Sequence, residues 1–230
     1  DALLALPTLL PQTPIFRLED AGMARTLSEY VLAAVLRVYR KFDQYVVSQA
    51  AGRWQPEPLP ARGSYKIGVL GLGVIGAAIA TALAHYGFAV RGHARTRKQI
   101  DGVETFDASE LDNFLARTDI LVGLLPLTPE TSGFYDAGLF AKLRRNGALG
   151  QAVFINAGRG KSQVEADIVS AIRNGTLGGA SLDVFEAEPL ASDSPLWDLQ
   201  NVFLTPHDAA VSEENALFRH VETQIARFER

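Results

Sequence analysis

The sequence predicts an α/β protein built on a Rossmann-type, doubly wound parallel sheet, and three observations support this class. An apolar run at 67–70 precedes Gly71, Gly73 and Gly76 at G-x-G-x-x-G spacing, and an apolar stretch of helical length then ends at Gly87. Apolar runs typical of buried strands alternate with helical segments through the rest of the chain. Polar residues follow the ends of several of these strands, which is where ligands bind in open α/β sheets.

The glycine-rich segment predicts a strand, a tight turn and a helix that together hold a dinucleotide. Gly71 allows the turn, Gly73 lets the backbone approach a pyrophosphate, and Gly76 lets the helix pack closely on the sheet. The free N–H groups and the positive end of the helix then face the anion. The alternative is a purely structural glycine turn.

The residues after the second expected strand, 88–92, indicate which dinucleotide is bound. No acidic residue, which would bind a ribose 2′-hydroxyl, occurs between Ala77 and Ile100. The strand instead leads into Arg95, Thr96 and Arg97, whose guanidinium and hydroxyl groups can pair with a 2′-phosphate. The sequence therefore favours NADP(H) over NAD(H), with a solvated basic loop as the alternative.

The remaining elements continue the alternation. A capping box, Ser162-x-x-Glu165, is expected to open the helix that ends at Gly175. A turn rich in proline and threonine is expected from Pro126 to Thr131. Further strands are expected at 119–125, 152–156, 179–183 and 202–205, and further helices at 107–117, at 136–143 and from about 212 to the end.

A long amphipathic helix is expected at 24–49, before the glycine turn, with Leu27, Val31, Val35 and Val38 at helical spacing. A linker with three prolines follows at 53–63. The apolar face of the helix needs a partner, which favours a homodimer; packing within its own chain is the alternative.

Composition restricts the classes of function. The chain has 230 residues, of which 47% are hydrophobic, so it can bury a sizeable core. A net charge of −4 argues against a nucleic-acid partner. Cysteine is absent, which excludes thiolate metal sites and cysteine nucleophiles, and no other metal-ligand cluster is evident. No apolar run reaches the ~20 residues of a membrane span. We expect a cytoplasmic protein with no metal and no membrane partner.

Three polar residues stand out after the later strands. Arg159 follows 152–156, Glu188 follows 179–183, and His207 follows 202–205. Because the carboxyl ends of parallel strands meet at one edge, these side chains can converge where a nicotinamide would lie. Each alone could be an ordinary surface residue, and Glu186 competes with Glu188.

The chain closely resembles the D-isomer-specific 2-hydroxyacid dehydrogenases, and within them the glyoxylate/hydroxypyruvate reductase A type. The motifs that carry the resemblance are the glycine turn and the segments at 124–131, 156–160, 183–190 and 205–207. The resemblance implies that Arg159, Glu188 and His207 take the catalytic positions. It also implies that the cofactor is contacted by Val74, Ile75, Pro126, Thr131, Ala157, Gly158 and Asp183 as well as by Arg159 and His207.

Reduction of a 2-oxo acid to a D-2-hydroxy acid gives these residues definite roles. His207 can supply the proton to the carbonyl oxygen. Glu188, if hydrogen-bonded to the imidazole ring, favours its protonated form. Arg159 can hold the substrate carboxylate and polarise the carbonyl. The hydride comes from the cofactor. Asp208 is unusual, since the family commonly has an apolar residue after the histidine.

By the same resemblance, most of a flavodoxin-like substrate domain is missing. We expect a remnant of it at 1–16, a dimerisation arm with linker at 17–63, the NAD(P)-binding Rossmann domain at 64–211 and a returning C-terminal helix at 212–230. The alternatives to a reductase are a non-catalytic, corepressor-like NAD(P)-binding protein, a cofactor-binding fragment that is inactive without its substrate domain, and a purely structural Rossmann domain.

Overall fold

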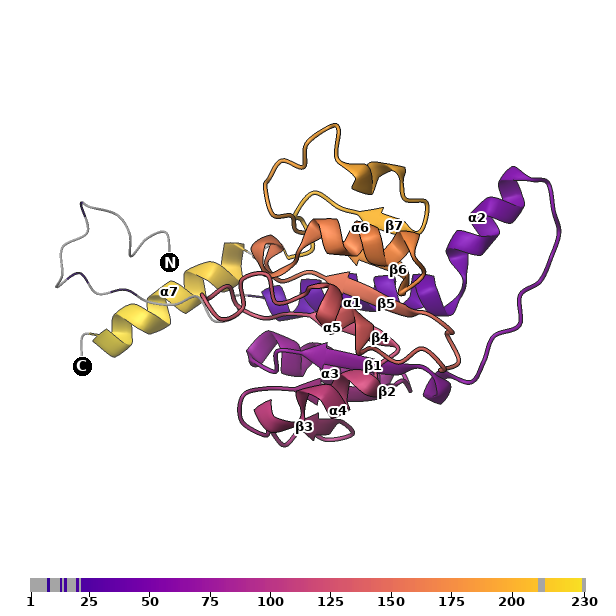
Figure 1. Ribbon diagram of the computed structural model, residues 1–230. Helices are drawn as coiled ribbons and strands as arrows, with labels where there is room; N and C mark the ends of the chain where they lie inside the picture. Colours follow the sequence, from indigo (N-terminus) through magenta and orange to yellow (C-terminus); the bar gives the residue numbers. More distant parts are fainter. Residues whose placement is uncertain are drawn as a thin grey trace.

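The computed structural model describes residues 22–210 and 214–228, together with positions 8, 13, 15 and 20. The fold is a seven-stranded parallel sheet with the order β3-β2-β1-β4-β5-β6-β7 (Figure 1). The order reverses between β1 and β4, so the expected doubly wound sheet is confirmed. The strands are β1 (Lys66–Leu70), β2 (Ala89–His93), β3 (Glu104–Phe106), β4 (Ile120–Gly123), β5 (Ala152–Asn156), β6 (Leu177–Leu182) and β7 (Val202–Leu204).

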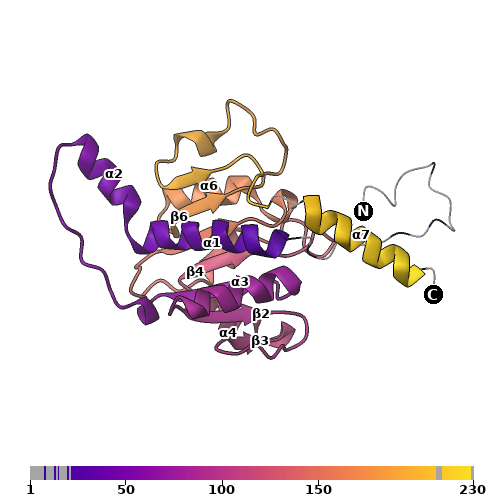
Figure 2. The ribbon, with the colours of Figure 1, turned by 180° about the vertical axis from the view of Figure 1, so that it is seen from behind.

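Helices cover both faces of the sheet. α1 (Met23–Tyr39) and α3 (Val74–His85) lie on the face toward the viewer in Figure 2. α4 (Leu111–Ala116), α5 (Ala137–Ala141) and α6 (Glu165–Arg173) lie on the other face (Figure 1). Each face has its own core, since β-strands buried on both sides present apolar side chains to both layers. Val31, Ile79 and Val122 belong to one core, and Phe114, Phe154 and Ile168 to the other.

The predicted helix at 24–49 is wrong as a single element. α1 ends at Tyr39, and α2 (Phe42–Ala50) starts a new helix after Lys41, whose φ of 57° lies in the left-handed region. Residues of α1 are buried against the sheet, whereas none in α2 is. The chain turns where α1 leaves the sheet, and α2 extends away from it (Figure 1). The sequence pattern did not show the break, because both helices carry apolar residues and the helical spacing of these residues continues across it.

The predicted capping box at Ser162 is also wrong. Ser162 lies in the short 3-10 helix η3 (Gly160–Ser162), and its buried hydroxyl has no hydrogen-bond partner among the described residues. α6 begins at Glu165, after Val164, without a side-chain cap. The Glu165 carboxylate accepts instead from the backbone N–H of Glu186 at 2.6 Å. The helix start is therefore held by the loop after β6, through a contact that local spacing does not reveal.

The other elements match their expected positions to within a few residues, apart from two at the β2 edge. β3 was not expected, and the predicted helix at 107–117 divides into η2 (Ala108–Glu110) and α4. The 3-10 helices η1 (Arg62–Ser64) and η4 (Pro195–Asp198) lie in connecting segments. None of the helices in the described part of the chain combines the length and the apolar character needed to span a bilayer.

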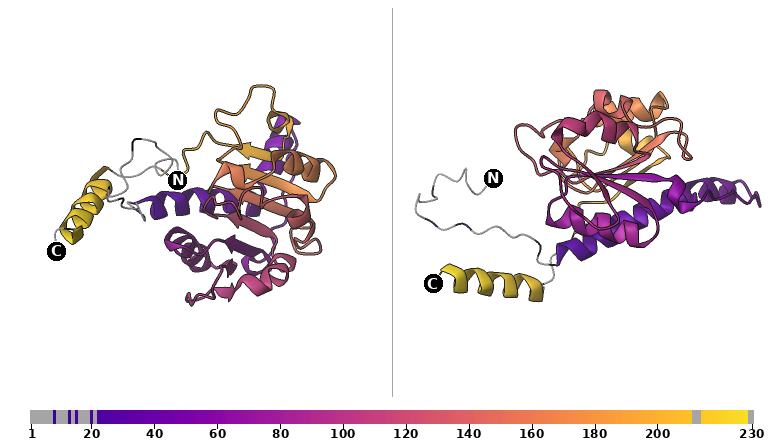
Figure 3. Two further views of the ribbon diagram at one scale, coloured as in Figure 1. Left: turned by 60° about the vertical axis from the view of Figure 1, so that its left-hand side comes forward. Right: turned by 90° about the horizontal axis from the view of Figure 1, so that it is seen from below.

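α7 (Glu214–Phe228), the last helix that the structure describes, extends away from the sheet (Figure 3). The predicted start of this helix near Ser212 falls outside the described residues, as does the predicted substrate-domain remnant at 1–16, apart from Thr8, Thr13 and Ile15.

Candidate functional site

The glycine turn lies directly after β1, at the point where the strand order reverses. Gly71 has a φ of 111°, and a Cβ at this position would lie 2.8 Å from the carbonyl oxygen of Leu124. Around a Cβ on Gly73, by contrast, there is open space to 4 Å. α3 starts at Val74, and Gly73 offers its first N–H groups no side-chain cap. The residues therefore fit a bound pyrophosphate, because an open backbone surface faces the uncapped N–H groups of Val74, Ile75 and Gly76.

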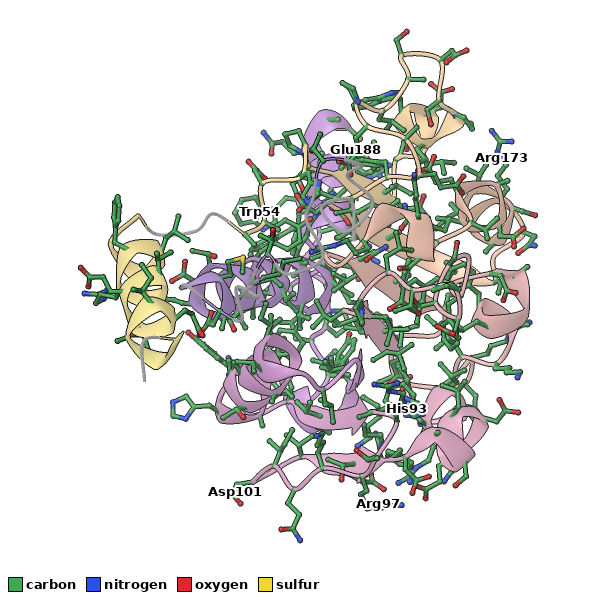
Figure 4. All side chains as sticks on the ribbon, turned by 90° about the vertical axis from the view of Figure 1, so that its left-hand side faces the viewer. Trp54, His93, Arg97, Asp101, Arg173 and Glu188 are labelled. Carbon is green, nitrogen blue, oxygen red and sulfur yellow. The ribbon has the colours of Figure 1, made fainter. Side chains whose placement is uncertain are left out.

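The basic loop after β2 is exposed at Arg95, Thr96 and Arg97. Arg97 donates to the Thr105 carbonyl oxygen at 2.6 Å and contacts Glu110, and its guanidinium lies 3.7 Å from Asp107. Arg95 makes no ion pair with any described residue. Arg95 is therefore more available than Arg97 to pair with an anionic ligand, since Asp107 and Glu110 already compensate the charge of Arg97. Figure 4 labels Arg97 at the outer edge of the fold, beside the more deeply placed His93.

The loops after β4 and β5 complete the wall near the glycine turn. Thr131 closes its loop, since its hydroxyl donates to the Pro126 carbonyl oxygen at 2.5 Å and accepts from the Thr128 N–H at 2.8 Å. Ala157 is buried, and a Cβ on Gly158 would lie 3.1 Å from the Gly123 carbonyl oxygen. The threonine hydroxyl therefore shapes its own loop, and the Ala157–Gly158 backbone packs directly on the end of β4.

Arg159 is exposed on the loop after β5 and donates to the Gly158 carbonyl oxygen at 2.7 Å. The next residue, Gly160, lies against the backbone of Phe185 so closely that any Cβ would overlap it. Asn156 supports the same loop, because its side chain accepts from Gly158 N–H at 3.0 Å and donates to Gln163 at 2.8 Å. The loop bearing Arg159 is therefore packed against the loop that bears Glu188.

Glu188 and His207 are brought together as the sequence predicted. The distance between His207 Nδ1 and Glu188 Oε2 is 2.7 Å, and Glu188 Oε1 accepts from the Phe185 N–H at 3.0 Å. Burial opposes ionisation of Glu188, but the hydrogen bonds from His207 and Phe185 and the charges of His207 and Arg159 outweigh it, so its pKa is lowered from the ordinary 4.5. Glu188 is therefore an ionised acceptor that fixes one ring nitrogen of His207. The competing candidate, Glu186, accepts from the Glu165 N–H at 2.6 Å instead.

A cavity of about 610 Å³ adjoins this pair. Its walls are mainly apolar, and His207 and Glu188 supply its ionisable groups. Trp197 lines this cavity with 55% of its surface exposed, and its indole N–H donates to the Ala191 carbonyl oxygen at 2.9 Å. The remaining lining residues are Phe185, Pro189, Leu190, Leu204, Thr205 and Pro206.

Asp183 lies beneath the turn that carries His207 and is 2% exposed. Its carboxylate accepts from the Thr205 hydroxyl at 2.7 Å and from the N–H groups of Asp208 and Ala209, each at 3.1 Å. Thr205 in turn lies 2.9 Å from the Tyr30 hydroxyl. Sequence reasoning gave neither Thr205 nor Tyr30 a role, although Thr205 stands two positions before His207. The side chain of Asp208 is exposed, and its backbone N–H provides its contact with Asp183.

Comparison with known proteins shows which family and which solved structures this chain is similar to. Residues 32–209 match the family described as D-isomer specific 2-hydroxyacid dehydrogenase, NAD binding domain. Glyoxylate/hydroxypyruvate reductase A of Escherichia fergusonii is 41% identical over 223 residues, which are 96% of this chain and 70% of that protein.

Two solved structures are similar throughout this chain. One is a probable 2-hydroxyacid dehydrogenase from Rhizobium etli in complex with NADP, HEPES and L(+)-tartaric acid, with 61% identity and a TM-score of 0.93 over all of this chain and 72% of that one. The other is an NADPH-dependent glyoxylate/hydroxypyruvate reductase from Sinorhizobium meliloti in complex with NADP and sulfate, with 51% identity and a TM-score of 0.95 over 99% of this chain and 72% of that one. The rest of those chains has no counterpart in this sequence.

Proposed function

This chain belongs to the D-isomer specific 2-hydroxyacid dehydrogenases, an NAD(P)-dependent oxidoreductase family, and on that premise we propose that it reduces a small 2-oxo acid with NADPH. The substrate class is glyoxylate or hydroxypyruvate, as the names of its relatives state for those proteins. The product is the D-2-hydroxy acid. The 2.7 Å contact between His207 and Glu188 carries the proposal.

The His207–Glu188 pair can donate a proton to the substrate from one ring nitrogen, Nε2. Glu188 is ionised and accepts from Nδ1, so it orients the ring and leaves Nε2 without a partner among the described residues. In the reductive direction, Nε2 of His207 donates the proton to the carbonyl oxygen of the substrate. Glu188 retains its charge and keeps the ring in one orientation.

Arg159 binds the substrate carboxylate. A guanidinium can form two parallel hydrogen bonds with a carboxylate, and a fixed cation also stabilises negative charge that develops on the carbonyl oxygen. Its backbone is held in place by Asn156 and by the close approach of Gly160 to Phe185. The loop can therefore present the side chain of Arg159 in a fixed position.

NADPH supplies the hydride when it is bound. The uncapped start of α3 would hold the pyrophosphate, and Arg95 and Thr96 would bind the 2′-phosphate, with a smaller contribution from Arg97. Pro126, Thr131, Ala157 and Gly158 would hold the nicotinamide half. The relatives that were solved with NADP or described as NADPH-dependent support the choice of NADPH over NADH.

Replacement of His207 by Asn tests the assignment. We expect kcat for glyoxylate or hydroxypyruvate to fall about 10²- to 10⁴-fold, the usual contribution of a positioned acid, while the dissociation constant of NADPH, measured by fluorescence titration, stays within a few-fold. His85→Asn is the matched control, since His85 is exposed at the end of α3. Loss of NADPH binding in His207→Asn, or full activity, would contradict the proposed role.

The same assay separates the reductase from its rivals. A non-catalytic, corepressor-like protein binds NADPH but does not oxidise it with any of the 2-oxo acids. A purely structural domain gives no fluorescence change with NADPH.

A further inference from the structure

His207 occupies an unfavourable backbone conformation. Its φ is 59°, one of two positive values among the non-glycine residues described. Residues with a Cβ rarely adopt this region, and they persist in it only when the surrounding contacts compensate its free-energy cost. The turn at 206–209 therefore needs contacts that hold its backbone, in addition to the one that the His207 ring makes with Glu188.

Asp183 supplies the first of these contacts. It is buried, it has no cationic partner among the described residues, and its two oxygens accept from the N–H groups of Asp208 and Ala209. These are the two amides directly after His207. A buried carboxylate without an ion pair depends on such donors for its stability, so the carboxylate and the turn stabilise each other.

The third donor to Asp183 fixes the direction of a longer chain of hydrogen bonds. Thr205 has one hydroxyl proton, which it donates to Asp183. The Tyr30 hydroxyl, 2.9 Å from Thr205, must then be the donor to Thr205. The order is therefore Tyr30 to Thr205 to Asp183, and from Asp183 to the backbone after His207.

Tyr30 lies on α1, which also packs on β7 at a second point, since the Arg37 guanidinium lies 4.1 Å from the centre of the Phe203 ring. α1 leads into α2, whose exposed apolar residues include Phe42, Val46 and Val47. The hydroxyl of Tyr30 is thus a point at which α1 is linked by hydrogen bonds to the turn of His207.

We propose that Tyr30 is a positioning residue for His207, acting through Thr205 and Asp183. Its hydroxyl orients Thr205, Thr205 orients the carboxylate, and the carboxylate fixes the turn from which His207 reaches the substrate. The inference rests on the role proposed for His207, and it predicts that a change on α1 alters turnover more than binding.

A double-mutant cycle tests this chain of contacts. Tyr30→Phe removes one hydroxyl, and we expect kcat to fall about three- to tenfold, the size of one net hydrogen bond, while KM for the 2-oxo acid and the NADPH dissociation constant change less than twofold. Thr205→Val should lower kcat further. In the Thr205→Val background, Tyr30→Phe should have no additional effect, because the intermediate hydroxyl is gone. Tyr39→Phe is the matched control, since Tyr39 lies on the same helix but packs edge-on against Tyr65 and Phe88.

A measurement that does not need turnover keeps this inference separate from the proposed function. The chain has four histidines, so the His207 ring signals in an NMR spectrum can be assigned with His207→Asn. Tyr30→Phe should shift or broaden the signals of His207 and leave His85 unchanged. If wild-type protein oxidises NADPH with none of the 2-oxo acids, the proposed function fails, and these signals still decide the positioning role. Unchanged His207 signals, or additive losses of kcat in the cycle, would overturn it.

Discussion

Replacement of Gly160 by Ala tests whether the close approach of two loops organises the site. A Cβ at this position would overlap the carbonyl oxygen, carbonyl carbon and nitrogen of Phe185. These are backbone atoms, so no side-chain rotation can relieve the overlap. Because real Cβ atoms are essentially never found under 3.0 Å from such neighbours, the loop bearing Arg159 and the loop bearing Glu188 must separate by about 1 Å.

The size of the effect follows from that displacement. A misplacement of about 1 Å in a reacting group can reduce the rate about 10²-fold, so we expect kcat/KM to fall by that factor. Overpacking of this kind costs about 1–3 kcal/mol of stability. For a chain of this size, each kcal/mol corresponds to roughly 2–4 °C in Tm. The NADPH dissociation constant should change only a few-fold, because the start of α3 is not involved.

The assay combines steady-state kinetics, thermal unfolding and NADPH titration, with Gly63→Ala as the matched control. A Cβ on Gly63 meets no atom within 4 Å, so that variant should behave as wild type in all three measurements. A Gly160→Ala protein with normal Tm and normal kcat/KM would show that the two loops are not held against each other and that their contact does not fix the position of Arg159.

Two further predictions concern the β2 edge. Arg95→Ser should raise the NADPH dissociation constant about 10- to 100-fold, as expected for one charge-assisted hydrogen bond, and leave the NADH dissociation constant unchanged. Arg97→Ser should have a smaller effect on the NADPH dissociation constant in the same titrations, since Asp107 and Glu110 already compensate the charge of Arg97. Equal losses of affinity for both cofactors would refute the 2′-phosphate assignment. Burial lowers the pKa of His93 from its ordinary 6.5, and its Nε2 has no hydrogen-bond partner among the described residues. The unfolded chain therefore binds a proton on this histidine at a pH where the folded chain does not. The free energy of unfolding consequently decreases as the pH falls below about 6.5. His93→Phe should therefore raise Tm and flatten its decrease between pH 7.5 and pH 5 in thermal melts, and an unchanged pH dependence would count against a buried, neutral His93.

The sequence was sufficient for the features that depend on local pattern. β1, the glycine turn and α3 are adjacent in the chain, and their glycine spacing reports directly on backbone geometry. The central strands β1, β4 and β5 are buried on both faces, so their apolar runs were visible in the sequence. Parallel strands that end at one edge bring Arg159, Glu188 and His207 to that edge, which is why residues from three separate loops could be grouped.

The errors occurred where tertiary contacts override the local pattern. Helical periodicity does not show that α1 ends where it leaves the sheet, nor that Lys41 adopts a positive φ. β3 has three residues and lies at the sheet edge, too short for a pattern. The spacing of Ser162 and Glu165 satisfied a capping rule, but Glu186 approaches from the next loop and provides the contact that Glu165 makes.

The hydrogen-bonded chain beneath His207 could not have been found from local pattern for a related reason. Tyr30 and Thr205 are separated by 175 positions, and neither belongs to a motif that specifies the other. Asp183 has the residue type expected of a ligand contact, yet all three hydrogen bonds it accepts come from the chain's own donors. The cofactor contact predicted for Asp183 stays a prediction beside this structural role. The donors that the structure shows link the turn of His207, through Asp183 and Thr205, to Tyr30 on α1, a helix far from it in the sequence.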